Sequence, residues 1–148
     1  MMYVPPYEAL VRSLDTTPAA IASAKAVAIP GALLKLLLQM AVAHSDFDEE
    51  RYLAVNPDVK QAVERGDIES GHVHYVGFGY FEGRLGGMEE VDETWYLRAY
   101  PDVAQALRDN QVASATQHFY LVGGGEGRSP NADQLDNAMR WKNTLRGD

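Results

Sequence analysis

The sequence of 148 residues contains no cysteine, which excludes disulfides, thiolate metal sites and cysteine nucleophiles. It also lacks a long apolar run: the most apolar stretch, residues 32–44, falls short of the roughly 20 residues that a membrane-spanning helix needs. We therefore expect no membrane insertion. No basic region followed by an apolar core and a small-residue cleavage site opens the chain, which argues against a secretory signal. A cytoplasmic location is expected, with secretion through a C-terminal signal left open.

Recognisable catalytic and cofactor motifs are missing too. No serine lies in a G-x-S-x-G pattern, and neither H-E-x-x-H nor a calcium-loop pattern occurs. His72 and His74 are two residues apart, so a helix would place them on different faces. The glycine-rich run 123–127 lacks the lysine of a phosphate-binding loop. The sequence predicts a protein that is not an enzyme, with no catalytic residues, no metal and no cofactor; a hydrolase or transferase activity is the weakest alternative.

Basic residues are scarce in one part of the chain. The formal net charge is −8, and all of it falls on residues 47–130, which hold 7 basic and 15 acidic side chains. Such a region repels phosphate backbones and anionic lipid surfaces. We expect no nucleic-acid partner, whereas a basic protein or a neutral polymer would be tolerated.

One stretch of the sequence occurs twice. Residues 47–84 and 91–128 align without a gap at an offset of 44 residues, and 15 of the 38 aligned positions are identical. A fixed period indicates a repeated supersecondary unit. The identical pairs are Asp48/Asp92, Glu49/Glu93, Tyr52/Tyr96, Leu53/Leu97, Pro57/Pro101, Asp58/Asp102, Val59/Val103, Gln61/Gln105, Ala62/Ala106, Ser70/Ser114, His74/His118, Gly79/Gly123, Glu82/Glu126, Gly83/Gly127 and Arg84/Arg128.

Each copy is predicted to form three short helices. In the first copy Asp48 is a natural N-cap, Pro57 ends one helix and opens the next, and Ser70 begins the third. Gly79 is expected to end the third helix in a left-handed conformation. The second copy repeats these features 44 residues later.

The flanking segments are also predicted to be helical, so the fold class is all-α. Thr17 and Pro18 begin an alanine-rich helix that we expect to reach Ala28, before Pro30 and Gly31 break it. The last helix is expected over residues 132–145, with a buried side formed by Leu135, Ala138, Met139 and Trp141. The predicted parts are an N-terminal helical segment (1–46), repeat 1 (47–90), repeat 2 (91–130) and a C-terminal helix and tail (131–148).

The helix expected over residues 32–44 is apolar nearly all round. A helix of this kind must be buried on several sides. Two interpretations stay open: it is the central helix on which the repeats pack, or part of it is a homo-oligomer interface. The side chains that would form that interface are Leu33, Leu36, Leu37 and Met40.

The polar residues that both copies share have two readings. A functional reading makes them an acid–base or binding cluster. A structural reading makes them fasteners of the fold, with the histidine bonded to a loop carbonyl, the arginine to a carboxylate, and the glutamate capping a turn. We favour the structural reading, because an enzyme needs one active site while a repeated fold needs its fasteners in every copy. These predicted fasteners are Asp58, His74, Glu82, Arg84, Asp102, His118, Glu126 and Arg128.

Aromatic residues beside the glycine turns are the alternative lead. Rings with nearby carboxylates and an arginine can stack on sugars or on the side chains of a partner. The residues of this predicted aromatic rim are Tyr80, Phe81, Trp95 and Tyr120.

The pattern Y-L-x-x-N/Y-P-D-V, then H-Y/F, then G-x-x-E-G-R, resembles a short helical repeat of bacterial proteins. That repeat is often appended to glycosyltransferases and other proteins of surface polysaccharide production, and to some large secreted proteins. The resemblance covers residues 47–130 and brings no catalytic residues. It implies a non-catalytic protein–protein interaction or scaffold module that serves surface polysaccharide synthesis or export. A glycosyltransferase or export component would be the partner, and direct carbohydrate binding is the alternative function.

Overall fold

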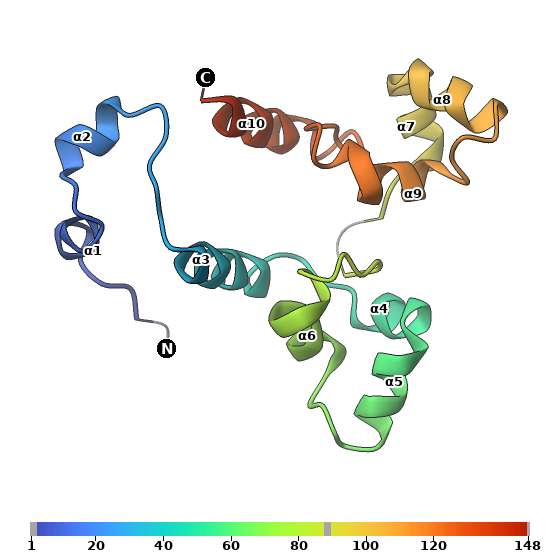
Figure 1. The fold of residues 1–148 in the computed structure, drawn as a ribbon. Coiled ribbons are helices and arrows are strands. Elements are labelled where there is room, and N and C mark those ends of the chain that lie inside the picture. The colour runs from blue at the N-terminus through green and yellow to red at the C-terminus, as the bar shows by residue number, and fades with distance from the viewer. Residues whose placement is uncertain (1–2, 88–89, 148) are drawn as a thin grey trace. The chain divides into compact units, whose positions relative to one another are not determined.

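The computed structural model describes residues 3–87 and 90–147, and in these ranges every regular element is a helix (Figure 1). The all-α class is therefore confirmed for this part of the chain. Contacts divide the chain into two compact units, one made mainly of the residues up to Leu38 and one of residues 39–146. Among the described residues, none of the helices is both long enough and apolar enough to span a bilayer.

The first unit contains α1 (Tyr7–Ser13), α2 (Pro18–Ser23) and most of α3 (Gly31–Ala43). Thr17 caps α2 as expected, since its side chain accepts the Ala20 N–H at 3.1 Å. The helix ends at Ser23, however, and Ala24 is extended, so the expected helix to Ala28 is wrong. No residue of α2 is buried. Because most helices in proteins are stabilised by packing of one face, a short helix without a buried face gains little stability from additional residues.

Helix α3 is much less buried than its composition suggested. Val42 is its only buried residue, and it packs in the core of the first repeat with Tyr52. Leu34, Leu36 and Leu37 are exposed. The expectation of a helix buried on several sides therefore does not hold for these leucines.

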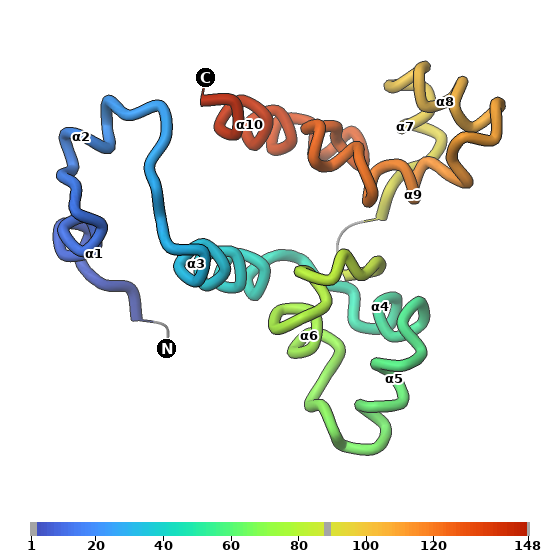
Figure 2. Tube along the Cα trace, viewed as in Figure 1, coloured from blue at the N-terminus to red at the C-terminus, as the bar shows by residue number. Residues whose placement is uncertain are grey.

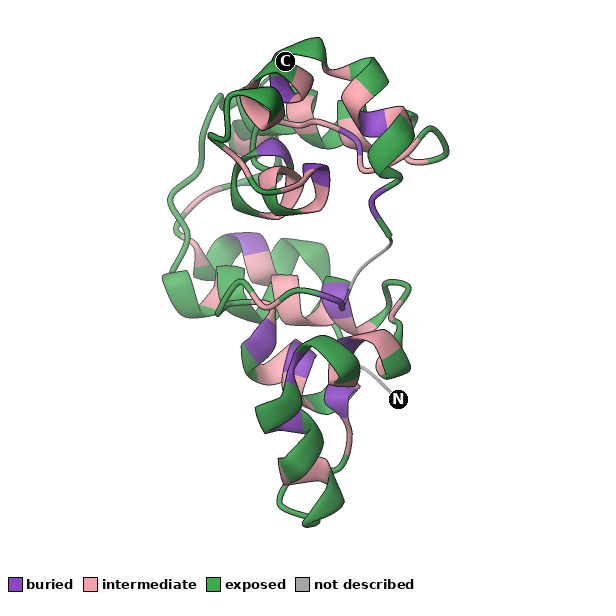
Figure 3. Ribbon diagram, turned by 90° about the vertical axis from the view of Figure 1, so that its right-hand side faces the viewer, coloured by how far each residue is buried: buried purple, intermediate pink, exposed green. Residues whose placement is uncertain are grey.

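The first repeat consists of α4 (Glu49–Val55), α5 (Pro57–Glu64) and α6 (Gly71–His74), which continues into a π-helical turn, η1 (Tyr75–Gly79). The predicted caps form, because Asp48 accepts the Arg51 N–H and Ser70 accepts the Val73 N–H. Tyr52, Val59 and Tyr75 of this repeat form one buried core with Val42 of α3. Buried positions are purple in Figure 3.

The second repeat consists of α7 (Glu93–Ala99), α8 (Pro101–Arg108), α9 (Ala115–His118) and a second π-helical turn, η2 (Phe119–Gly123). Each element begins and ends 44 residues after its counterpart. Figure 2 traces the backbone of the two repeats, with α4 to α6 in green and α7 to α9 in yellow and orange. The core consists of Val91, Tyr96, Val103 and Ala115. Sequence-equivalent positions therefore form equivalent local structure.

The glycines that end the third helices in a left-handed conformation are not the predicted ones. Gly83 and Gly127 have positive φ angles of 70° and 79°, while Gly79 and Gly123 lie inside the π-helical turns. In the first repeat the Gly83 N–H donates to the Tyr80 carbonyl and the Arg84 N–H to the Gly79 carbonyl, the pair of bonds that defines a Schellman motif. The prediction of left-handed caps at Gly79 and Gly123 is wrong, because the helix runs one turn further before it ends.

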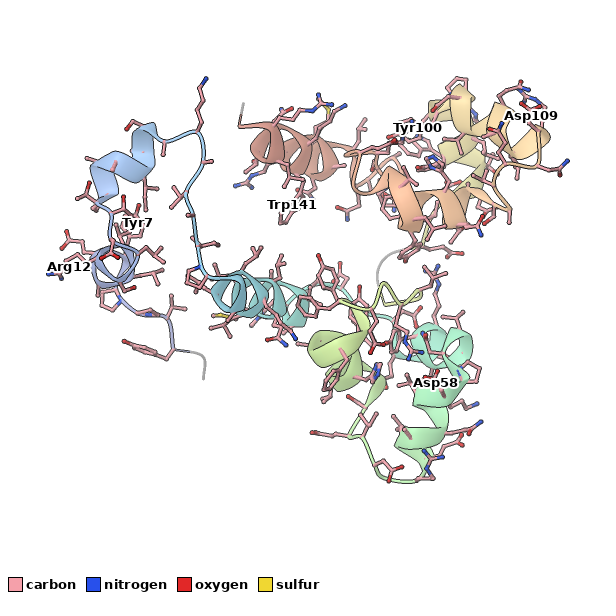
Figure 4. The ribbon with its side chains drawn as sticks, viewed as in Figure 1. Tyr7, Arg12, Asp58, Tyr100, Asp109 and Trp141 are labelled. Atoms are coloured by element: carbon pink, nitrogen blue, oxygen red, sulfur yellow. The ribbon has the colours of Figure 1, made fainter. Side chains whose placement is uncertain are left out.

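The chain closes with α10 (Leu135–Arg146), which contains no buried residue. Leu135, Met139 and Trp141 were expected on a buried side, yet all three are exposed, and the Trp141 side chain projects from the helix (Figure 4). The expected C-terminal helix forms, although it begins at Leu135 and not at residue 132. Its apolar residues stay exposed because a stripe of apolar side chains is buried only where another surface covers it.

Candidate functional site

A tyrosine and a histidine join the first and third helices of each repeat. The Tyr52 hydroxyl is hydrogen-bonded to His74 Nδ1 at 2.9 Å, and Tyr96 is bonded to His118 Nδ1 at the same distance. Both tyrosines are fully buried, and burial raises the pKa of each phenol to about 12, against the opposing effect of the nearby arginine. The histidines were expected to bond a loop carbonyl; in the structure each bonds the tyrosine of its own repeat instead.

Each tyrosine hydroxyl lies directly against a glycine of the π-helical turn. A Cβ atom on Gly79 would overlap the Tyr52 hydroxyl, and one on Gly123 would overlap the Tyr96 hydroxyl. The equivalent contact occurs in both copies, which explains why the two glycines recur although neither needs a positive φ. Tyrosine, histidine and glycine thus form one packed set in each repeat.

A second polar cluster lies at the end of the first repeat, around residues 82–84, which we call the exit turn. The Arg84 Nε donates to Glu82 at 2.9 Å, and its NH1 donates to Asp58 at 2.9 Å. These contacts tie the exit turn to the first turn of α5, on which Asp58 lies (Figure 4). We call this arginine with its two carboxylates the clasp.

The clasp of the second repeat is more extensive. Arg128 donates through NH1 and NH2 to both carboxylate oxygens of Asp102, at 2.8 and 2.7 Å, and through Nε to Glu126 at 2.7 Å. Its guanidinium carbon also lies 5.0 Å from the centre of the Tyr100 ring. The hydrogen bonds from Arg128 lower the pKa of Asp102 to about 2.

The expected turn-capping glutamates are in fact clasp residues, and a different glutamate caps a backbone turn. The Glu49 carboxylate accepts the N–H groups of Gly71 and His72, at 2.6 and 2.8 Å, where α6 begins. Glu93 accepts the N–H and the hydroxyl of Thr116 at the equivalent place in the second copy. Sequence reasoning missed this role, although the identity of Glu49 and Glu93 at the 44-residue offset was the available signal.

Most of the predicted aromatic rim packs inward. Tyr80, Trp95 and Tyr120 are half-buried and lie against the two cores, and burial raises the pKa of Tyr120. Phe81 alone of the four is exposed. The structure does not bring the four rings together into one site within either repeat core, since Tyr80 belongs to the first core and Trp95 and Tyr120 to the second.

The polar clusters of the two repeats bond internally. The Tyr–His pairs and the clasps each occur twice, and in both copies the side chains bond one another. Among the described residues, no group of three or more histidine or acidic side chains is placed to hold a metal ion.

Comparison of the chain with protein-family models, with curated proteins and with solved structures finds no match.

Proposed function

We propose that this protein is a non-catalytic interaction module that binds other proteins, including copies of itself. One observation carries this proposal. Both copies use their shared polar side chains for the same internal bonds, Tyr52 to His74 and Arg84 to Asp58 in the first copy, with the same pairs in the second. Residues that serve the fold twice over are poor candidates for a single reaction centre.

Self-association is assigned to α3. Leu34, Leu36 and Leu37 leave apolar surface exposed, Leu33 and Met40 are half-buried, and the one charged residue of the helix is Lys35. Residues 1–46 carry no net charge, whereas residues 47–130 carry all of the −8. Two copies would therefore repel one another least where α3 lies, and apolar area removed from water would favour their association. The proposed interface consists of Leu33, Leu36, Leu37 and Met40.

The biological setting rests on the resemblance of residues 47–130 to repeats appended to bacterial glycosyltransferases. We infer that the module serves surface polysaccharide synthesis or export from the cytoplasm, with a glycosyltransferase or export component as its partner. The clasps, which account for the recurring aspartate, glutamate and arginine of the motif, support the interpretation of that motif as a structural one.

Light scattering tests the self-association directly. The wild-type chain is expected to have a mass above that of one chain, and Leu36→Ser with Leu37→Ser is expected to reduce it to a monomer. Leu121→Ser is the matched control, because Leu121 is an exposed leucine outside α3 and its replacement should leave the assembly intact. A wild-type protein that is strictly monomeric would overturn the role of α3.

Carbohydrate binding is the second candidate, and the exposure of Phe81 is the observation in its favour. Stacking on a sugar needs an accessible ring face. Phe81→Ala should therefore abolish binding of a neutral polysaccharide, measured by affinity electrophoresis, without changing the mass in light scattering. Unchanged retardation of the variant, or none for the wild type, would remove this candidate.

A further inference from the structure

The third helix of each repeat turns an apolar side away from its core. Tyr75 and Gly79 point inward in the first repeat, while Phe78 between them is 62% exposed and Val73, about one turn earlier, is also exposed. In the second repeat Val122, the counterpart of Phe78, is exposed beside Leu121, which is 74% exposed.

A carboxylate follows these apolar residues on the same face. The Glu82 N–H donates to the Phe78 carbonyl, and the Glu126 N–H donates to the Val122 carbonyl, so each glutamate lies one helical turn beyond the exposed apolar residue. We define the outer face of a repeat by these positions, which are Val73, Phe78 and Glu82 in the first copy and Gln117, Val122 and Glu126 in the second.

The clasps give this face a negative charge. Each has two carboxylates for one guanidinium, and the carboxylates lie outermost: the side chains of Asp58 and Glu82 are 61% and 48% exposed, against 29% for Arg84. The second clasp has the same order, with 62% and 46% for its carboxylates and 21% for Arg128. The outer face thus combines an exposed apolar side chain with a net negative rim.

We propose that the outer face of each repeat binds a basic amphipathic helix of a partner protein. Such a helix would place apolar side chains on Phe78 or Val122 and lysine or arginine side chains beside the clasp carboxylates. This inference rests on the proposed function and names the chemistry of the partner. The charge of −8 on residues 47–130 disfavours a second copy, an acidic segment or a nucleic acid at this face.

The first repeat is the stronger site, because its outer face presents Phe78 and Val73 where the second presents Val122 and Gln117. Burial of a phenylalanine ring removes more apolar surface from water than burial of a valine.

The test uses the full chain and two fluorescent synthetic helical peptides that differ only in charge: one with leucine on one face and lysine on the other, and one with glutamate in place of each lysine. Fluorescence anisotropy is expected to show binding of the lysine peptide and none of the glutamate peptide. Raising the salt from about 0.05 M to about 0.5 M should weaken the complex, since the rim charges are exposed.

Two variants locate the site. Phe78→Ser should weaken binding of the lysine peptide by about tenfold or more, and Glu82→Gln, which keeps an acceptor for Arg84 but removes the charge, should weaken it by a few-fold. Leu145→Ser changes an exposed leucine on α10 and should leave the affinity as it is. Circular dichroism checks that each variant stays folded.

Equal binding of the two peptides, absence of binding by either, or a folded Phe78→Ser variant that binds as the wild type does would each overturn the proposal. The mass measured by light scattering does not depend on peptide binding at the outer face. A failure of this inference is therefore distinguishable from a failure of self-association through α3. Binding of the lysine peptide with the expected loss in Phe78→Ser would support it.

Discussion

The residue that follows the exit turn is hydrogen-bonded by Asn56 in the first repeat and by Tyr100 in the second. The Asn56 side-chain amide donates to the carbonyls of Tyr52 and Leu85, at 2.8 and 2.9 Å. At the equivalent position the Tyr100 hydroxyl accepts the Ser129 N–H at 2.8 Å. Leu85 and Ser129 are themselves 44 residues apart. The position before the proline therefore requires a side chain that can reach the residue after the exit turn and hydrogen-bond its backbone. Either a donor or an acceptor meets this requirement.

The same comparison applies to the clasps. Arg84 contacts Asp58 through one nitrogen, whereas Arg128 contacts Asp102 through two and also lies over the Tyr100 ring. Asn56 has no ring for Arg84 to lie over, and its side-chain oxygen instead accepts a hydrogen bond from Arg84 NH1 at 3.4 Å. The residue before the proline therefore contributes both to the contact with the residue after the exit turn and to the clasp. The core tyrosine, the histidine and the glycine do not vary between the copies, and they should be the least tolerant of change.

Removal of the core tyrosine is expected to have the largest effect. Tyr52→Ala and Tyr96→Ala each delete a fully buried ring, for which losses of about 3–5 kcal/mol are typical, and each leaves its histidine without this partner. Urea unfolding followed by circular dichroism would measure the loss. Tyr3→Ala, at an exposed tyrosine, is the control and should stay within about 0.5 kcal/mol of the wild type. A loss below about 1 kcal/mol in either core variant would contradict the equivalence of the two copies.

Substitution of the glycines in the π-helical turns is expected to cause the second-largest loss of stability. Gly79→Ala and Gly123→Ala would press a methyl group against the tyrosine hydroxyl, which we expect to cost about 1–3 kcal/mol of unfolding free energy. Gly77→Ala is the matched control, because a Cβ there meets no atom within 4 Å and alanine favours helix.

The double variant Tyr52→Phe with Gly79→Ala sharpens this second prediction. Loss of the hydroxyl makes room for the methyl group, so the two changes together should cost less than the sum of their separate effects in a double-mutant cycle. Additive effects would show that the hydroxyl is not what excludes a side chain at Gly79.

The two clasps should differ in strength. Arg128→Ala is expected to lower the free energy of unfolding by about 1–2 kcal/mol and Arg84→Ala by about 0.5–1 kcal/mol. The reason is that Arg128 makes a bidentate contact with Asp102 and also lies over the Tyr100 ring. Arg65→Ala removes an exposed ion pair with Asp67 and should change stability by no more than about 0.5 kcal/mol. Chemical denaturation of the three variants would rank them, and the reverse order for the two clasps would refute the comparison.

The smallest expected effect is on the pH dependence of stability. The folded-state pKa of Asp102, about 2, lies below its ordinary value of 3.8, so its ionised form stabilises the fold above about pH 4, and that contribution is lost as the pH falls towards 2. Asp102 is largely exposed, which limits the contribution to about 0.5 kcal/mol. Thermal unfolding of wild type and Asp102→Asn should differ at pH 5 and converge near pH 2. A difference that persists at pH 2 would exclude this cause.

The helices of the repeats were predictable because their signals are local. Asp48 bonds a backbone N–H three residues away, and Pro57 ends one helix and opens the next without help from distant residues. The cap at Thr17 is equally local, which is why α2 begins where expected even though it ends early.

The partners of the recurring polar residues were not predictable in the same way. His74 meets Tyr52 across 22 residues and Glu49 meets Gly71 across the same separation, so these contacts depend on how the helices pack. The prediction for Gly79 is wrong for this reason: its sequence neighbours indicate a helix end, while the distant hydroxyl of Tyr52 is what requires a glycine. Exposure of the apolar residues of α10 likewise depends on whether another surface covers them.

The contact between the tyrosine hydroxyl and the glycine has a consequence for how such a repeat can evolve. In both copies the glycine follows the tyrosine by 27 positions, and a side chain at one site is compatible only with the loss of the hydroxyl at the other. A lineage that replaced the glycine first would pass through a less stable ancestor, whereas one that first exchanged tyrosine for phenylalanine would not meet that barrier. Descendants of this repeat should therefore keep both residues or have changed both, and a glycine-free copy should carry phenylalanine where the tyrosine stood.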